Sequence, residues 1–188
     1  MYLKLGFAHV LDWKGYDHML FLIVLCVAFL LKDWKKALLY VTVFTVGHTF
    51  SMCLSVFDIL KIDERAASLF IPLTILVTAV YRIFFPGVGR HNAKHNFLLL
   101  SCFVFGCIHG LGFSLYFSVI SDSLDSLLVP LFAFMVGIEL SQLVLVFGFL
   151  ILNTLLHLFF HVNQRDRILV IAAMVVGLTL PMLSLIHI

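Results

Sequence analysis

The chain has 188 residues, of which 63% are hydrophobic and only 12% are charged. A soluble domain is closer to half apolar and a quarter charged, so a soluble fold of this size would leave large apolar patches exposed to water. The net charge of +2 is too small to indicate a partner such as nucleic acid. These values predict a chain whose solvent is mostly lipid.

Apolar segments long enough to cross a bilayer, which takes about 20 residues, follow one another along the chain. We predict them at residues 15–31, 37–57, 66–85, 97–120, 127–162 and 168–186. The fold class is therefore all-α, a polytopic membrane helix bundle of about six transmembrane helices, with residues 1–188 as a single transmembrane domain. The fifth segment is too long for one crossing. We expect it either to tilt and project beyond the bilayer or to bend near Asn153 and Thr154.

The distribution of lysine and arginine predicts the orientation, because connections on the cytoplasmic side carry an excess of both. One side of the predicted bundle holds eight of them and the other holds four. The eight are Lys32, Lys35, Lys36, Arg82, Arg90, Lys94, Arg165 and Arg167, and the four are Lys4, Lys14, Lys61 and Arg65. We expect a multi-pass protein of the cell inner membrane with both termini outside.

Several titratable residues interrupt the apolar segments. Asp17 and His18 lie at the outer end of the first segment, His48 and His109 lie near the middle of the second and fourth, and Glu139 lies in the first half of the fifth. A charge at the bilayer centre costs at least a few kcal/mol, so such residues face the bundle interior and usually have a function. On the predicted orientation all five fall between the midplane and the outer surface. We therefore expect them to converge.

Imidazoles and carboxylates that converge from several helices match the ligand set of a divalent metal such as nickel, cobalt or zinc. We predict a metal site from His18, His48, His109, Asp17 and Glu139, with His48 and His109 close enough to share one ion. His9 precedes the first segment, in a stretch that could form a short interfacial helix. It is either a further ligand or an interfacial histidine. The alternative for each histidine alone is a hydrogen-bonded structural role.

Four stretches of the chain together resemble the HupE/UreJ family of membrane proteins. They are GFAHVLDWKGYDHMLFL (6–22), FTVGHTFSM (44–52), FGCIHGLGFS (105–114) and VGIELSQ (136–142). The family is usually described as nickel or cobalt permeases that serve hydrogenase and urease. The resemblance implies that Asp17, His18, His48, His109 and Glu139 are the family's characteristic polar positions. The family pattern has a histidine five residues before the Asp-His pair, whereas His9 lies eight residues before Asp17 here.

Two functions use the same residues. In a permease for Ni²⁺ or Co²⁺, Asp17 and His18 would receive the ion at the outer mouth, and His48, His109 and Glu139 would bind it midway. In a membrane-embedded zinc-dependent hydrolase, the three histidines would hold Zn²⁺ beside an open position for water, and Glu139 or Asp17 would act as the base. A structural or sensing subunit is the third reading. The expected partners are the lipid bilayer, a divalent metal ion and a possible homo-oligomer.

Overall fold

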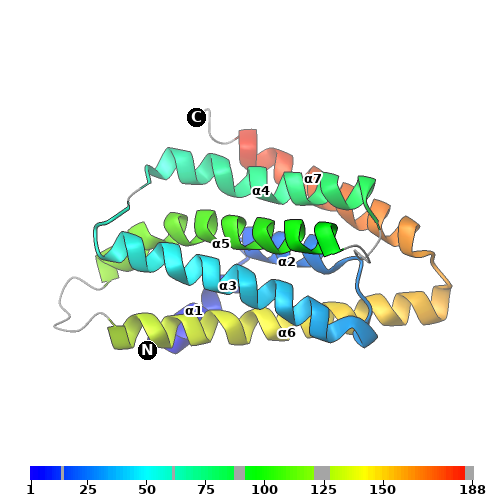
Figure 1. Ribbon diagram of the computed structural model, residues 1–188, viewed down its shortest axis with the longest axis horizontal. Coiled ribbons are helices and arrows are strands. Elements are labelled where there is room, and N and C mark those ends of the chain that lie inside the picture. Colours follow the sequence, from blue (N-terminus) through cyan, green and yellow to red (C-terminus); the bar gives the residue numbers. More distant parts are fainter. Residues whose placement is uncertain (14, 61, 87–91, 121–127, 185–188) are drawn as a thin grey trace.

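A computed structural model describes the chain except for residues 14, 61, 87–91, 121–127 and 185–188. The described residues form seven α-helices and one short 3-10 helix (Figure 1). In chain order these are α1 (Tyr2–Val10), α2 (Asp17–Cys26), η1 (Leu31–Asp33), α3 (Trp34–Val56), α4 (Glu64–Phe84), α5 (Asn92–Ile120), α6 (Leu128–Phe160) and α7 (Gln164–Ser184). The predicted all-α fold is confirmed.

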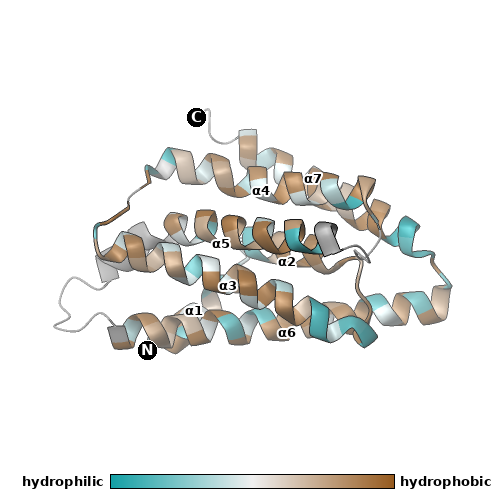
Figure 2. Cartoon of the chain, in the orientation of Figure 1, coloured by the Kyte–Doolittle hydropathy of each residue, from teal (hydrophilic) through white to brown (hydrophobic). Residues whose placement is uncertain are grey.

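Five of the described helices, α3 to α7, are long and apolar enough to cross a membrane. Large apolar side chains on their outer faces, such as Leu100, Phe132 and Met174, are more than half exposed. Lipid is the solvent in which such a surface is stable. Apolar residues line most of the length of the bundle, and hydrophilic residues gather near helix ends such as the start of α7 (Figure 2). The chain is a multi-pass membrane protein.

The first predicted segment does not form a full-length spanning helix. It forms α2, which has 10 residues and is therefore about 15 Å long, half of the hydrocarbon thickness. Residues 27–30 continue without regular helix, and Val27, Ala28 and Phe29 are nevertheless buried. Backbone at this depth must find its hydrogen bonds inside the protein, because lipid supplies none.

Side chains from three other helices supply those hydrogen bonds. Arg82 on α4 donates to the carbonyl of Leu25. Asn153 on α6 donates to the carbonyls of Val27 and Phe29 at 3.0 and 2.7 Å. In addition, Gln164 at the start of α7 donates to the carbonyl of Ala28 at 3.1 Å. Arg82, counted above among the cytoplasmic charges, is only 1% exposed and holds the end of a half-length helix.

The fifth predicted segment is one continuous helix. α6 has 33 residues and passes through Asn153 and Thr154 without a break in the helix. At 1.5 Å per residue the helix is about 50 Å long, whereas the hydrocarbon core is about 30 Å thick. α6 must therefore tilt or extend past the hydrocarbon.

Close helix contacts set the arrangement in space. α3 packs along α5, α1 along α6 and α4 along α7 (Figure 1). Glycines permit the first of these contacts: a Cβ added at Gly47, Gly106 or Gly110 would come within 2.1–2.2 Å of a backbone oxygen of the facing helix. Small residues of this kind let membrane helices approach closely. α7 runs back toward the end of the bundle at which α1 begins (Figure 1).

Candidate metal centre

Four histidines from four helices gather inside the bundle. His9 lies in the last turn of α1 and His18 in the first turn of α2, while His48 and His109 lie within α3 and α5. The ring of His18 is central, with centroid distances of 4.7 Å to His9, 5.7 Å to His48 and 5.0 Å to His109. The predicted convergence of His18, His48 and His109 with Asp17 is therefore found, and His9 joins them.

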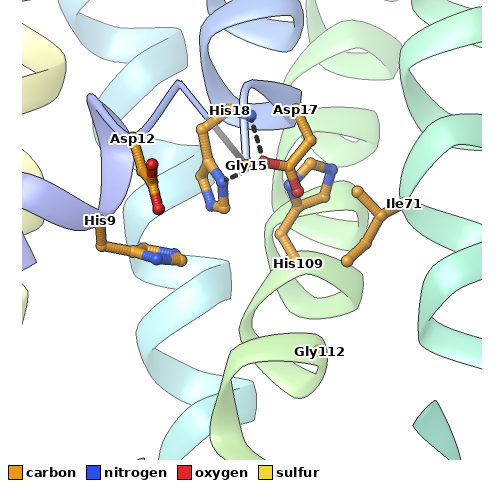
Figure 3. A pocket seen from close by; sticks show the side chains of 8 residues that line it. All are labelled: His9, Asp12, Gly15, Asp17, His18, Ile71, His109 and Gly112. Atoms are coloured by element: carbon orange, nitrogen blue, oxygen red, sulfur yellow. Dashed lines mark hydrogen bonds and ion pairs between the residues drawn. The ribbon is translucent and has the colours of Figure 1, made fainter. Parts of the chain in front are cut away.

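A cavity of about 170 Å³ opens beside these rings. Its lining consists of His9, Asp12, Gly15, Asp17, His18, Ile71, His109 and Gly112 (Figure 3). Asp12 is exposed and belongs to the connection between α1 and α2. A second carboxylate therefore lies at the rim of the cavity. Space beside convergent polar groups is the usual form of a small-ligand site.

Asp17 fixes the orientation of its neighbour His18. One carboxylate oxygen of Asp17, Oδ1, accepts the backbone N–H of His18 at 2.9 Å and lies 3.2 Å from Nδ1 of the same residue. Since a carboxylate only accepts, Nδ1 carries the hydrogen and Nε2 keeps a lone pair. Within the described part of the chain, Nε2 of His18 is buried without a hydrogen-bond partner. A carboxylate behind an imidazole is the usual support of a metal-binding histidine.

His109 is oriented in the same manner by Thr74 on α4. The Thr74 hydroxyl donates to the carbonyl of Ile71 at 2.7 Å, and its oxygen lies 3.0 Å from Nε2 of His109. Because the hydroxyl hydrogen is already used, the oxygen accepts the Nε2–H of His109. The lone pair of His109 is then on Nδ1, which has no hydrogen-bond partner among the described residues.

His48 is the most enclosed of the four imidazoles. It is 0% exposed, and neither of its ring nitrogens has a hydrogen-bond partner in the described structure. A buried polar group without a partner costs about 1–3 kcal/mol. A structural histidine would normally be satisfied, so the arrangement is more consistent with a ligand that is poised for an ion.

The ligand atoms form two overlapping groups. Within the described residues, His9, His18 and His48 can each bring one ligand atom within 4.8 Å of the others, and so can Asp17, His18 and His109. His48 and His109 fall in different groups, and the close approach expected for this pair stays a prediction. His18 belongs to both groups.

Glu139 lies in neither of the two groups. Its Oε1 accepts a hydrogen bond from Thr42 at 2.8 Å, and Thr42 precedes His48 by six residues, or about 9 Å along α3. The neighbouring pair has the same form, since Thr45 donates to Oε1 of Gln142 at 2.8 Å. The α3–α6 contact therefore carries a second set of polar groups, which continues from His48 toward the start of α3.

Thr74, Asp12 and Ile71 contact the histidines or line the cavity but were not predicted from the sequence. A threonine in an apolar helix is common, and only the packing of α4 against α5 gives Thr74 its role. No sequence pattern signals these three residues.

The family model described as HupE / UreJ protein matches residues 1–185 of the chain. No curated protein and no solved structure matches it.

Proposed function

Since the chain belongs to the HupE/UreJ family, we propose that it is a permease that carries Ni²⁺ or Co²⁺ across the cell inner membrane. The observation that supports this most strongly is that three imidazoles and the Asp17 carboxylate line one cavity, with a fourth imidazole, His48, within ligand distance of His9 and His18. The ion is the cargo of the protein. Both termini lie outside, so that the cavity faces the outer half of the membrane.

The donor set suits the proposed cargo. Imidazole nitrogen binds nickel, cobalt and zinc well, whereas magnesium and calcium prefer all-oxygen sites. One carboxylate among four neutral rings offsets only part of a divalent charge. An ion held here is therefore bound but not fully neutralised, and a transporter must let its ion leave.

Entry begins at the carboxylates. Asp12 at the rim attracts the cation, and Asp17 with His18 accepts it as its water is replaced. The N-terminus of α2 carries a partial positive charge that favours the anionic Asp17 in its first turn. The carboxylate is thereby kept ionised and ready to bind.

Exit uses the polar groups between α3 and α6. Thr45 and then Thr42 follow His48 in the direction of the start of α3, and they donate hydrogen bonds to Gln142 and Glu139 of α6. Oε2 of Glu139 is buried and has no hydrogen-bond partner within the described residues. This oxygen is available to an ion that leaves the histidines.

Uptake into sealed vesicles tests the proposal. Purified protein in liposomes that enclose a metal-sensitive dye should admit Co²⁺ and Ni²⁺, and His18→Ala should abolish this uptake. The matched control is His157→Ala, which removes an exposed imidazole from the far end of α6 and should leave uptake unchanged. Bound metal without any uptake by the unmutated protein would contradict the permease and favour the zinc hydrolase instead.

Glu139→Gln tests the exit step separately. Because Glu139 lies outside both histidine groups, the variant should retain metal binding in detergent while its uptake in vesicles falls. Lost binding would make Glu139 a ligand of the histidine site. Normal binding together with normal uptake would remove Glu139 from the route.

A further inference from the structure

We propose that the metal centre consists of two alternative sites that share His18, and that a single ion passes from one to the other. We name them the Asp17 triad (Asp17, His18, His109) and the His48 triad (His9, His18, His48). This inference deepens the proposed function, because it assigns the order in which that function's ligands act. It can also be tested by metal binding alone, without a measurement of transport.

The first step of the argument concerns the nitrogen that the triads share. Nδ1 of His18 is held by Asp17 at 3.2 Å, which leaves Nε2 as the nitrogen with a lone pair. One lone pair binds one ion. We infer that both triads use this nitrogen, so that His18 completes only one triad at a time and the two triads exclude each other instead of forming a two-metal centre.

The second step is that both triads lie near the geometry of a bound ion. Ligand atoms around a tetrahedral ion with bonds of about 2.0–2.1 Å are about 3.4 Å apart. The ligand atoms within each triad lie within 4.8 Å of one another. The ligand atoms of either triad would have to come at most about 1.4 Å closer, which is within the reach of side-chain rotation.

The third step gives the order of the two sites. Every member of the Asp17 triad lines the cavity, as does His9 (Figure 3). His48 is 0% exposed and is not part of that lining. An ion that enters through the cavity therefore meets the Asp17 triad first. His48 lies on the α3 face that continues with Thr45 and Thr42, so the His48 triad is the later site.

The transfer changes the role of Asp17. In the first site its carboxylate binds the ion directly. In the second site it remains hydrogen-bonded to Nδ1 of His18 and supports that ligand from behind, as outer carboxylates do for metal-bound histidines. The ion exchanges one anionic oxygen for a neutral nitrogen, so the negative charge that its ligands supply falls in the direction of travel.

The experiment measures binding of Co²⁺ to the full chain in detergent, by titration calorimetry and by the visible absorption of the bound cobalt. The unmutated protein should bind one equivalent. His48→Ala, which leaves the Asp17 triad, and His109→Ala, which leaves the His48 triad, should each still bind one equivalent, and their cobalt spectra should differ because one site contains oxygen. His18→Ala and the double variant His48→Ala/His109→Ala should lose affinity by more than the roughly 10–100-fold of an outer-shell change.

Three outcomes would overturn the two-site arrangement. Two equivalents on the unmutated protein would show a two-metal centre. Loss of binding in either single variant would show one composite site, provided that size-exclusion profiles and thermal unfolding match those of the His157→Ala control. No cobalt bound by the unmutated protein would exclude both triads.

A failure of the proposed permease function would give a different result from a failure of the two-site arrangement. If binding follows the expected pattern and vesicles take up no metal, the permease is contradicted and the two triads remain. If uptake occurs, His48→Ala should bind cobalt without transporting it, since the ion cannot advance. Normal transport by this variant would exclude the His48 triad as a step.

Discussion

Thr74 on α4 accepts a hydrogen bond from Nε2 of His109 on α5, across 3.0 Å. The contact matters because the hydroxyl hydrogen of Thr74 is already donated to the carbonyl of Ile71. The threonine oxygen is therefore fixed as an acceptor, and it determines which nitrogen of His109 keeps its lone pair. A residue outside both proposed triads thus orients one of the proposed ligands.

Thr74→Val should weaken Co²⁺ binding at the Asp17 triad by about 10–100-fold, as the loss of an outer-shell partner does. The measurement is calorimetric titration in the His48→Ala background, where only this triad remains. Thr74→Ser should restore the affinity. Thr179→Val is the control, because Thr179 is equally buried in α7 and donates only to Val175. Equal affinity of the valine and serine variants would contradict the orienting role.

Gly106→Ala should destabilise the bundle, because a Cβ there would lie 2.1 Å from the carbonyl oxygen of Phe44 on α3. The two helices would have to separate, at a cost of about 1–3 kcal/mol. Thermal unfolding in detergent measures the effect. Gly148→Ala is the matched control, since a Cβ at Gly148 meets nothing within 4 Å. Equal unfolding temperatures of the two variants would show that the close α3–α5 contact does not require glycine at residue 106.

Asn153→Leu should also lower the unfolding temperature. The side chain of Asn153 donates to the carbonyls of Val27 and Phe29, and a leucine of similar size leaves both unsatisfied in an apolar interior. Each buried carbonyl group without a hydrogen-bond partner costs about 1–3 kcal/mol. Leu152→Ala, at a neighbouring residue that is 53% exposed, should have little effect. A stable Asn153→Leu variant would show that residues 27–30 find other donors.

Reporter fusions test the orientation. A reporter after Ser184 should be active outside, as should one after Asp63, whereas one after Asp33 should be active in the cytoplasm. The expectation rests on the excess of lysine and arginine at one end of the bundle. A cytoplasmic reporter after Ser184 would reverse the assignment and would place the cavity on the inner side.

The sequence by itself determined the class of the protein and singled out most of the residues that we propose as ligands. Composition and apolar segment lengths required membrane-spanning helices, because no soluble fold could bury so much apolar surface. The cost of a charge in hydrocarbon singled out Asp17, His18, His48 and His109. Both inferences use properties of single residues and short segments, which do not depend on how the helices pack.

Packing decided the remainder. The apolar run after His18 contains no proline or glycine before residue 32, so nothing local ends α2 at Cys26. Where it ends, Arg82, Asn153 and Gln164 from three other helices donate to the carbonyls of Leu25, Val27, Ala28 and Phe29. The grouping of ligands has the same origin. The sequence pattern predicts the same depth in the membrane for Glu139 and His48. Which residues each of them contacts depends on how the helices are rotated toward one another. That rotation pairs Glu139 with Thr42 and makes His18 a member of both triads.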